Sequence, residues 1–346
     1  MLHTLADSRA PEATIRCGAL DGLDALLESH GVSLAAACAA AGVDDRLLEA
    51  PEARLPVRHY VELLEAAARI SGDDALGLHL GWAQTPASLG MLGEATVRAP
   101  DLGAAVACYS RYLYLHQEGA SLELHVDGRK AVVAYSIRDA EILDYRQDAE
   151  MSIAKMMRFA RLISGRPALT PAAVYFEHPE PRDTSEHRRL FGAPVYFSQP
   201  YNALVVPCEL LSARNVGADG EPLSLLQRHA QARRPEHCAD GGLMAEVRRQ
   251  ILRGLRCGDV SIETIAAAMS LSERTLQRRL GEHGESFNDL VSSLRFELSQ
   301  RYLRHDHLSL TEIGYLLGYS ELSAFSRAFR RWAGVSPIEF RRVACS

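Results

Sequence analysis

Three polar side chains near residue 275 are spaced so that one helix would present them together. Arg274, Gln277 and Arg278 lie three and four residues apart, while Leu276 and Leu280 fall on the opposite side of the same helix. In the major groove of DNA, arginine can bond to guanine O6 and N7, and glutamine to adenine N6 and N7. We therefore expect these three polar side chains to contact DNA bases.

The residues before this helix predict a partner helix and a tight turn. A stripe of apolar side chains recurs at helical spacing at Ile262, Ile265, Ala266 and Met269. Ser270 and Leu271 supply the turn, and Ser272 can cap the second helix by accepting a hydrogen bond from a free backbone N–H. The sequence thus predicts a helix-turn-helix unit over Ser261 to Gly284, in which Arg279 contacts phosphate.

An altered copy of this unit spans Leu310 to Gly334. Gly318 ends its first helix in the left-handed conformation that glycine adopts at low cost, and Ser320 is the expected cap of its second helix. The inward side of that second helix carries Phe325, Ala328, Phe329 and Trp332. The outward side carries Ser323, Ser326, Arg327, Arg330 and Arg331. We expect Arg327 to contact a base, and Arg330 and Arg331, a turn further on, to contact phosphates.

A single long helix over Phe287 to Arg304 is expected between the two units. Its apolar residues recur at every fourth position, at Leu290, Leu294, Leu298 and Tyr302, with Val291 beside them. Gln277 and Ser326 mark the middles of the two outward-facing helices and lie 49 residues apart. Two such helices on one side of DNA must enter successive major grooves, about 34 Å apart.

The charge of the chain is divided unevenly along its length. The net charge is −6, which by itself argues against a nucleic-acid binder. From Gly241 onward, however, 15 arginines and no lysine stand against 12 acidic residues, a net of +3, whereas the remainder has 23 basic and 32 acidic residues, a net of −9. An acidic body joined to a mildly basic end is compatible with two tasks in one chain.

The chain before about residue 210 mixes two periodicities. Apolar residues at helical spacing predict helices after Leu20 and over Val57–Ile70, Asp101–His116 and Glu141–Ser164. Alternation through Leu122–Val126 and then Asp127-Gly128 predicts a β-hairpin with a returning strand at Val133, Tyr135 and Ile137. Short strands are expected at Ala173–His178, Pro194–Phe197 and Asn202–Val206.

These patterns predict a fold class and a division into domains. We expect an α+β N-terminal domain, mostly helical with a small sheet, over residues 1–210, as a ligand-binding or dimerisation domain. Glycines and prolines punctuate residues 211–242, which are expected to form a linker containing a short helix. Residues 243–346 are expected to form an all-α domain with two helix-turn-helix units.

Composition narrows the class of protein further. The seven cysteines show no C-x-x-C spacing, so reduced, mostly buried thiols are expected. The first eighteen residues lack the apolar segment of a secretory signal. The longest apolar run, Leu34–Ala41, falls far short of the ~20 residues that cross a bilayer. We therefore expect a cytoplasmic protein with no membrane partner.

The C-terminal hundred residues resemble the DNA-binding domain of the AraC/XylS family, a seven-helix module with two helix-turn-helix units. The resemblance rests on RTLQRRL (Arg274–Leu280) and IGYLLGYSELSAFSRAFRRWAGVSPIEFR (Ile313–Arg341). It implies base contacts by Arg274, Gln277 and Arg278 in the first unit and by Leu322, Ser323, Ser326 and Arg327 in the second. Leu322 departs in character, because it offers only apolar contact, for instance to a thymine methyl.

The first ~210 residues resemble the N-terminal domain of AraC-type regulators of the ornithine-utilisation type, a ligand-binding domain. The matching stretches are LGMLGEATVRAPDLGAAV (Leu89–Val106), VYFEHPEP (Val174–Pro181) and RRLFGAPVYFSQPYNALVV (Arg188–Val206). The two resemblances imply a transcription regulator, most often an activator. The partners to be expected are double-stranded promoter DNA, RNA polymerase, a small-molecule effector of unknown identity and a second copy in a homodimer.

A catalytic role is not expected. The chain lacks the G-x-S-x-G, G-x-G-x-x-G, phosphate-loop and H-E-x-x-H motifs, so we predict no catalytic residue, no cofactor and no metal. His305 and His307 bracket an aspartate and could bind a metal, but a solvated loop is the expectation there. Two alternatives stay open for the front half, namely a ligand-independent dimerisation module and a catalytic or covalently modified module with an activated cysteine.

A cluster of aromatic and basic side chains marks one place where a ligand could bind. Tyr109, Arg111, Tyr112, Tyr114 and His116 lie on one expected helix, beside the hairpin that carries Tyr135. An apolar pocket with a few polar groups is the usual form of a small-molecule site. Except for Tyr114, these are the predicted ligand-binding residues; the alternative is half-buried packing with solvated hydroxyls.

Overall fold

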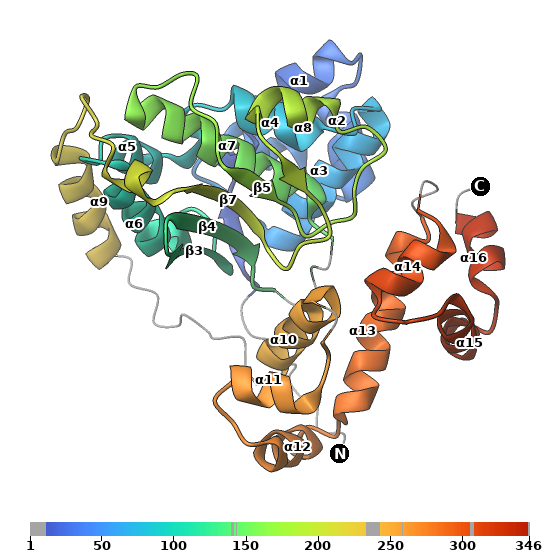
Figure 1. Ribbon diagram of the computed structural model, residues 1–346. Helices are drawn as coiled ribbons and strands as arrows, with labels where there is room; N and C mark the ends of the chain where they lie inside the picture. The colour runs from blue at the N-terminus through green and yellow to red at the C-terminus, as the bar shows by residue number, and fades with distance from the viewer. Residues whose placement is uncertain are drawn as a thin grey trace, which may run out of the picture.

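The computed structural model describes residues 12–139, 142, 144–232, 243–257, 259–304 and 308–344. The described residues form two hydrophobic cores (Figure 1). The core of the first region, which we define as residues 12–232, runs from Ile15 to Ala230. The core of the second region, defined as residues 243–344, runs from Val247 to Phe329. His305 and His307 lie outside the described residues.

The first region contains two sheets. The strands are β1 (Thr14–Arg16), β2 (Arg54–Pro56), β3 (Ala120–Asp127), β4 (Lys130–Ile137), β5 (Ala173–Tyr175), β6 (Val195–Tyr196) and β7 (Asn202–Pro207). β1 and β2 form a small antiparallel sheet, and the larger sheet has the order β3-β4-β7-β5-β6 with only β5 and β6 parallel. The predicted hairpin is confirmed, but Asp127 pairs with Lys130, so Gly128, at φ 57°, and Arg129 form the turn.

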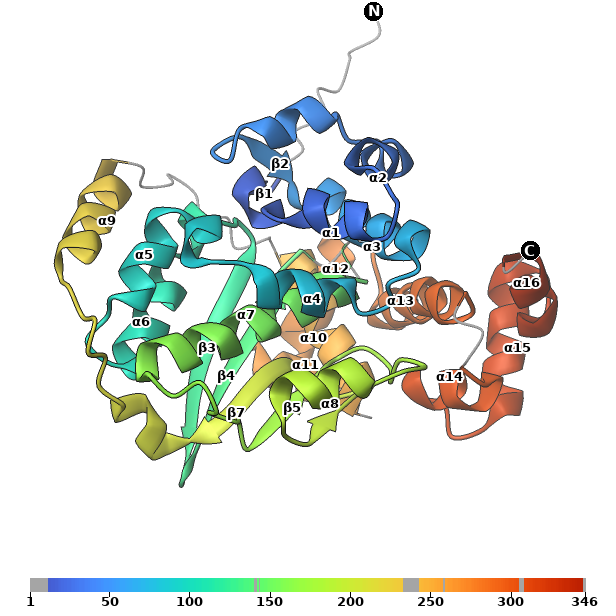
Figure 2. The same cartoon turned by 90° about the horizontal axis from the view of Figure 1, so that it is seen from above.

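Helices cover this sheet and pack on one another (Figure 2). The α-helices of the first region are α1 (Leu23–Ser29), α2 (Leu34–Ala41), α3 (Val57–Ser71), α4 (Leu76–Ala83), α5 (Met91–Val97), α6 (Leu102–Tyr112), α7 (Arg146–Ser164), α8 (Ser185–Phe191) and α9 (Glu221–Ala232). The 3-10 helices are η1 (Cys17–Leu20), η2 (Asp45–Glu49), η3 (Pro86–Leu89), η4 (Leu113–Leu115) and η5 (Cys208–Ser212). α9 lies in the expected linker, yet its Leu226 and Ala230 are part of the first core.

α7 is the central helix of the first region, packed between α4 and the sheet. Gly77 and Gly81 let α4 approach α7 closely. A Cβ at Gly77 would lie 2.1 Å from the backbone carbonyl oxygen of Gln147, and one at Gly81 would lie 2.2 Å from that of Met151. The predicted start of this helix at residue 141 is wrong. Tyr145, with φ −144° and ψ 43°, is not helical, and its hydroxyl donates to Glu177 Oε2 at 2.6 Å.

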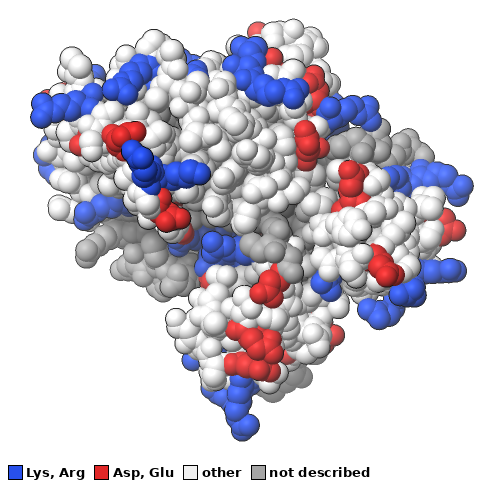
Figure 3. Space-filling model, in the orientation of Figure 1, with Lys and Arg blue, Asp and Glu red and all other residues white. Residues whose placement is uncertain are grey.

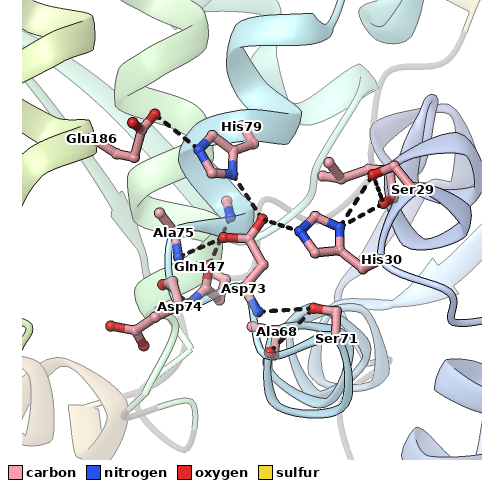
Figure 4. Close-up of polar contacts among 12 residues, drawn as sticks. Ser29, His30, Ala68, Ser71, Asp73, Asp74, Ala75, His79, Gln147 and Glu186 are labelled. Atoms are coloured by element: carbon pink, nitrogen blue, oxygen red, sulfur yellow. Dashed lines mark hydrogen bonds and ion pairs between the residues drawn. The ribbon is translucent and has the colours of Figure 1, made fainter. Parts of the chain in front are cut away.

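A polar cluster joins helices that are distant in sequence (Figure 4). His79 on α4 places Nδ1 2.7 Å from Asp73 Oδ2 and Nε2 3.0 Å from Glu186 Oε2 at the start of α8. His30, just after α1, reaches the same Asp73 oxygen at 3.9 Å. The two carboxylates raise the pKa of His79, so its charged form is favoured and the cluster holds α4 against α8.

The second region is entirely helical where it is described. Its helices are α10 (Leu243–Cys257), α11 (Ile262–Ala268), α12 (Glu273–Glu282), α13 (Phe287–Tyr302), α14 (Leu310–Leu316), α15 (Leu322–Ala333) and α16 (Pro337–Ala344). The expected spacer helix is α13, with Leu290, Val291, Leu294 and Leu298 buried. No helix in the described portion of the chain has the length and apolarity needed to span a membrane.

Candidate nucleic-acid interface

α11 and α12 form a helix-turn-helix pair. Ser270 takes a left-handed φ of 54° in the turn, and Ser272 then caps α12 by accepting the Thr275 backbone N–H at 3.2 Å. Leu276 and Leu280 are buried in the second core at 0% and 1% exposure. With one side of α12 anchored in this way, the opposite side is held outward.

The outward side of α12 carries the predicted DNA-contacting residues. Arg274, Gln277, Arg278 and Arg279 are all exposed, so the structure brings them together on one helix. Gln277 Nε2 donates to Glu273 Oε1 at 3.1 Å, and Arg278 forms an ion pair with Glu282. Arg274 and Arg279 make no ion pair with any described residue. Both intrahelical contacts are at the surface, where such pairs are weak, so they do not fix the Gln277 and Arg278 side chains in place.

α14 and α15 form the second pair. Gly318 has φ 76° and ends α14 as predicted, and Phe325 and Phe329 are fully buried. The predicted cap at Ser320 is wrong: the residue before α15 is Glu321, and no side chain caps this helix. Ser320 is one residue too early, because the cap must directly precede the first helical residue.

The outward side of α15 is more mixed than that of α12. Leu322, Ser323, Arg327, Arg330 and Arg331 are exposed, whereas Ser326 is half-buried. Ser323 donates to Glu321 Oε2 at 3.2 Å, so its hydroxyl is already bonded to an acidic neighbour. Figure 3 shows basic side chains at the lower tip of the molecule, where α12 lies, and along the edge occupied by α15 and α16. Acidic side chains lie beside them in the same view, so the exposed basic side chains form two groups, one at each helix pair.

Arg295 is a positioning residue that the sequence analysis did not identify. Its Nε donates to the Leu317 carbonyl at 2.9 Å, and its guanidinium lies 4.8 Å from the centre of the Tyr319 ring. These contacts tie α13 to the end of α14 and to the turn before α15. A lone arginine on an amphipathic helix gives no sequence signal of this role, because a solvated arginine has the same pattern.

In three cavities lined by described residues, the predicted ligand-binding residues of the first region are divided rather than brought together. Tyr109 lines a cavity between α6, α7 and the sheet, Arg111 and Tyr112 line a groove beside α9, and His116 lines a third pocket with Arg16. Burial, with the nearby Lys155 and Arg16, holds the pKa of His116 well below its usual range, so this imidazole is neutral.

Tyr135 belongs to a buried hydrogen-bond network. Its hydroxyl lies 2.8 Å from Asp148 Oδ2 and 3.1 Å from Gln117 Oε1, and Tyr60 donates to Asp148 Oδ1 at 2.8 Å. Burial raises the pKa of Asp148 to about 6, although both tyrosines favour the ionised carboxylate. These contacts give Tyr135 a structural role, although its side chain is fully buried with a bonded hydroxyl rather than half-buried with a solvated one.

Three of the four cysteines of the first region lack the features of an activated nucleophile. Cys17, Cys38 and Cys108 are buried and free, and burial raises the pKa of each thiol. Among the residues that the structure describes, no group of three or more His, Cys, Asp or Glu side chains is arranged to hold a metal.

Comparison with known proteins places both regions in one family. Residues 31–215 match the family model for the arabinose-binding domain of AraC transcription regulator, and residues 265–343 match that of a helix-turn-helix domain. The Ornithine utilization regulator of Pseudomonas aeruginosa is 30% identical over 323 residues, covering 92% of this chain and 93% of that protein. The regulator VirS of Mycobacterium tuberculosis is 30% identical, covering 84% and 85%.

Among solved structures, the transcriptional regulator CdpR of Pseudomonas aeruginosa aligns over 91% of this chain and 98% of its own, with 20% identity and a TM-score of 0.39. The family models account for the front half and for both helix pairs, and the two curated relatives match nearly from end to end. The chain therefore belongs to the AraC family of DNA-binding transcription regulators.

Proposed function

We propose that the second region grips double-stranded promoter DNA by inserting α12 and α15 into successive major grooves. The observation that carries this proposal is that both helices follow a tight turn, bury one side in the same core and expose arginines on the other. α13 lies between them, and its 16 residues span about 24 Å at about 1.5 Å per residue. A spacer of this length suits a groove repeat of about 34 Å once the width of the flanking helices is added.

The two helices would divide the work of recognition. α12 offers Arg274, Gln277 and Arg278 to base edges. α15 offers chiefly Arg327, with Leu322 limited to apolar contact and both Ser323 and Ser326 less free than a fully exposed hydroxyl. Base recognition would therefore reside mainly in the first half-site. Arg279, Arg330 and Arg331 would bind phosphates and fix the register.

For the first region we favour a sensor of a small molecule over a ligand-independent dimerisation module. An apolar cavity lined by one buried lysine supports sensing, because a purely dimerising domain gains nothing from burying an ammonium group that has no direct ion-pair partner among the described residues. Residues 1–210 would form this sensor and residues 243–346 the DNA-binding domain. Activation through RNA polymerase and binding as a homodimer complete the proposal.

A gel-shift titration of the full chain against duplexes from the DNA upstream of its own gene tests the proposal. We expect a specific complex whose affinity falls steeply with salt, because several arginines displace counterions from phosphates. Arg331→Ala should weaken binding to all duplexes alike and lower the salt slope by about one. Arg166→Ala, an exposed arginine of the first region, is the matched control and should leave binding unchanged. Absence of any sequence preference in the unaltered protein would refute the proposal.

A further inference from the structure

The cavity beside Tyr109 is apolar on nearly all sides. It lies between α6, α7, η5 and the inner face of β3, β4 and β7. Its walls include Leu102, Val106, Leu122, Val133, Phe159 and Leu204. Lys155 is the single charged side chain among the described residues that line it.

Lys155 is buried without a direct partner. It is 4% exposed, and no acceptor or carboxylate among the described residues lies within hydrogen-bond or ion-pair distance of its Nζ. The Asp148 carboxylate on the same helix attracts Lys155 electrostatically, but it already accepts hydrogen bonds from Tyr60 and Tyr135. Burial lowers the pKa of Lys155 to about 8, against the attraction of the Asp148 and Asp21 carboxylates, so at neutral pH the free protein carries a buried positive charge that neither carboxylate contacts directly.

Lysine is also rare in this chain, which makes its placement informative. The sequence has only two lysines, Lys130 and Lys155, among 38 basic residues. Lys130 is exposed at the end of the hairpin turn, whereas Lys155 lines the cavity. A lysine presents a compact point charge at the end of an apolar stem, which suits a single anionic group inside an apolar chamber.

We propose that this cavity binds a small amphipathic monocarboxylic acid, with its carboxylate paired to Lys155 and its hydrocarbon part against the apolar walls. One lysine neutralises one negative charge, whereas a phosphate dianion would keep an uncompensated charge in an apolar chamber. Tyr109 lines the same cavity, and burial raises the pKa of its hydroxyl, which stays protonated and able to donate. This site deepens the proposed sensor function and rests on it.

The cavity is also placed to influence the chain that leads to the second region. Leu210 and Leu211 of η5 form part of its wall. The following segment is fastened to the α5–α6 turn, where Asn215 Nδ2 donates to the Val97 carbonyl at 2.7 Å and to the Ala99 carbonyl at 2.8 Å. This segment continues into α9. A ligand that pushes on η5 would therefore act on the last described helix before the DNA-binding half.

The first test is calorimetric titration of the full chain with straight-chain carboxylates from hexanoate to hexadecanoate, 4-phenylbutyrate, and the matching alcohols. We expect an acid to bind, and Lys155→Met to weaken it at least tenfold while leaving the weaker binding of the matching alcohol unchanged. Methionine keeps an apolar stem of similar length, so this variant should fold. Lys130→Met is the matched control and should bind the acid normally. Equal acid affinity in the unaltered protein and in Lys155→Met, or no binding by the whole panel at millimolar concentration, would overturn the proposal.

A spectroscopic readout identifies the lysine directly. With carbon-13 at the lysine ε-carbon, the protein should give two side-chain signals, and the one absent from Lys155→Met should shift on saturation with the acid while the Lys130 signal stays in place. An unmoved Lys155 signal at saturation would place the acid elsewhere and contradict the site. Gel shifts on the same samples without acid test DNA binding separately, so a failed ligand site and a failed regulator are distinguishable.

The pH dependence supplies a third readout. Lys155 is faced by Asp148 on α7, Asp21 after η1, His116 after η4 and Tyr109 on α6, and only the lysine loses its positive charge near pH 8. Acid affinity should therefore hold up to the pKa of the lysine in the free protein, about 8, then fall by up to about tenfold per pH unit and level off above the higher pKa of the lysine in the complex. The Lys155→Met variant should show no such fall, and an identical pH profile in both proteins would contradict the pairing.

Discussion

The two regions place their polar groups in opposite ways. Of the 17 polar or charged residues that are buried in the described chain, 16 lie in the first region, and Ser299 is the single one in the second. In the second region, none of the arginines whose burial is described is fully buried, and the interior consists mainly of leucine, isoleucine and phenylalanine. The first region instead encloses Asp148, Glu150, Lys155 and their partners.

This difference matches the size of what each region would bind. DNA is a large polyanion that meets a protein at its surface, so an apolar interior that presents exposed arginines is sufficient. A small molecule is recognised by being enclosed, which requires polar groups to be buried inside the protein. If the comparison holds, stability should depend on apolar packing in the second region and on buried charge pairs in the first.

The largest effect in the second region should come from removing an aromatic ring from its core. Phe329 is fully buried, and its ring centre lies 5.9 Å from that of Phe325 and 5.4 Å from that of Phe340. Phe329→Ala should cost about 3–5 kcal/mol in the free energy of unfolding, because it leaves a cavity. Urea unfolding followed by Trp332 fluorescence in a Trp82→Phe background would measure this.

The chain provides its own control for that experiment, since its two tryptophans lie one in each region. In a Trp332→Phe background, Trp82 should report an unchanged transition for the first region in Phe329→Ala. A loss below about 1 kcal/mol, or a similar shift seen by both tryptophans, would contradict the account of the two separate cores.

The corresponding change in the first region is Glu150→Ala. Glu150 Oε1 lies 3.0 Å from both Arg146 Nε and His187 Nε2; burial alone would raise its pKa, yet Arg146 and His187 hold it at about 2. Removing one member of a buried pair should cost about 3–5 kcal/mol, measured through Trp82. Glu123→Ala removes an exposed glutamate 3.2 Å from His125 and should change stability by less than about 0.5 kcal/mol. Equal effects of the two substitutions would remove the contrast between the regions.

Asp148 gives the first region a pH dependence of a definite sign. Its pKa of about 6 lies above the ordinary value, so its contribution to stability is complete below about pH 4 and is lost as the pH rises through 6. Relative to Asp148→Asn, the unaltered protein should therefore lose stability between pH 4 and pH 6.5 when unfolding is followed through Trp82. A difference that stays constant, or that grows in favour of the unaltered protein, would show that Asp148 is not the buried group described.

The smallest expected effect is at the surface of α12. Glu282 pairs with Arg278 and adds a negative charge to the side that would face DNA. Exposed pairs are worth about 0.2–1 kcal/mol, so Glu282→Gln should strengthen DNA binding by up to about fivefold in fluorescence anisotropy at low salt. Glu28→Gln, at an exposed position of the first region, should have no effect, and weaker binding by Glu282→Gln would argue against α12 at the interface.

The helices and the core of the second region could be predicted well from the sequence, because its buried apolar residues recur at helical spacing. Leu276, Leu280, Phe325 and Phe329 recur at helical spacing, and their burial follows directly from that pattern. The error at Ser320 is one residue at a helix start, where the choice of cap depends on backbone angles rather than on residue type.

In the first region, the hairpin and the short strands could be predicted from the sequence, but the buried lysine of the proposed ligand site could not. The alternation around Leu122 and Tyr135 predicted the strands, whereas Lys155 sits among apolar and polar residues of α7 with no feature that distinguishes it from a solvated lysine. Its burial depends on α6 and the sheet, which are far away in sequence. The tyrosines on α6 were predicted to bind a ligand only because several aromatic side chains lie close together in the sequence. In the structure, Tyr109 and Tyr112 line different pockets.

The central claim is that α12 carries most of the base recognition and α15 chiefly the positioning. Selection of bound duplexes from a random pool, carried out with the unaltered full chain, Arg278→Ala and Arg327→Ala, tests it most directly. We predict a two-part site in which Arg278→Ala removes the preference at one or two positions of the more strongly specified half, at a cost of about 1–3 kcal/mol. Arg327→Ala should relax only the weaker half. Unchanged preferences in both variants, or a larger loss of specificity in Arg327→Ala, would contradict the account.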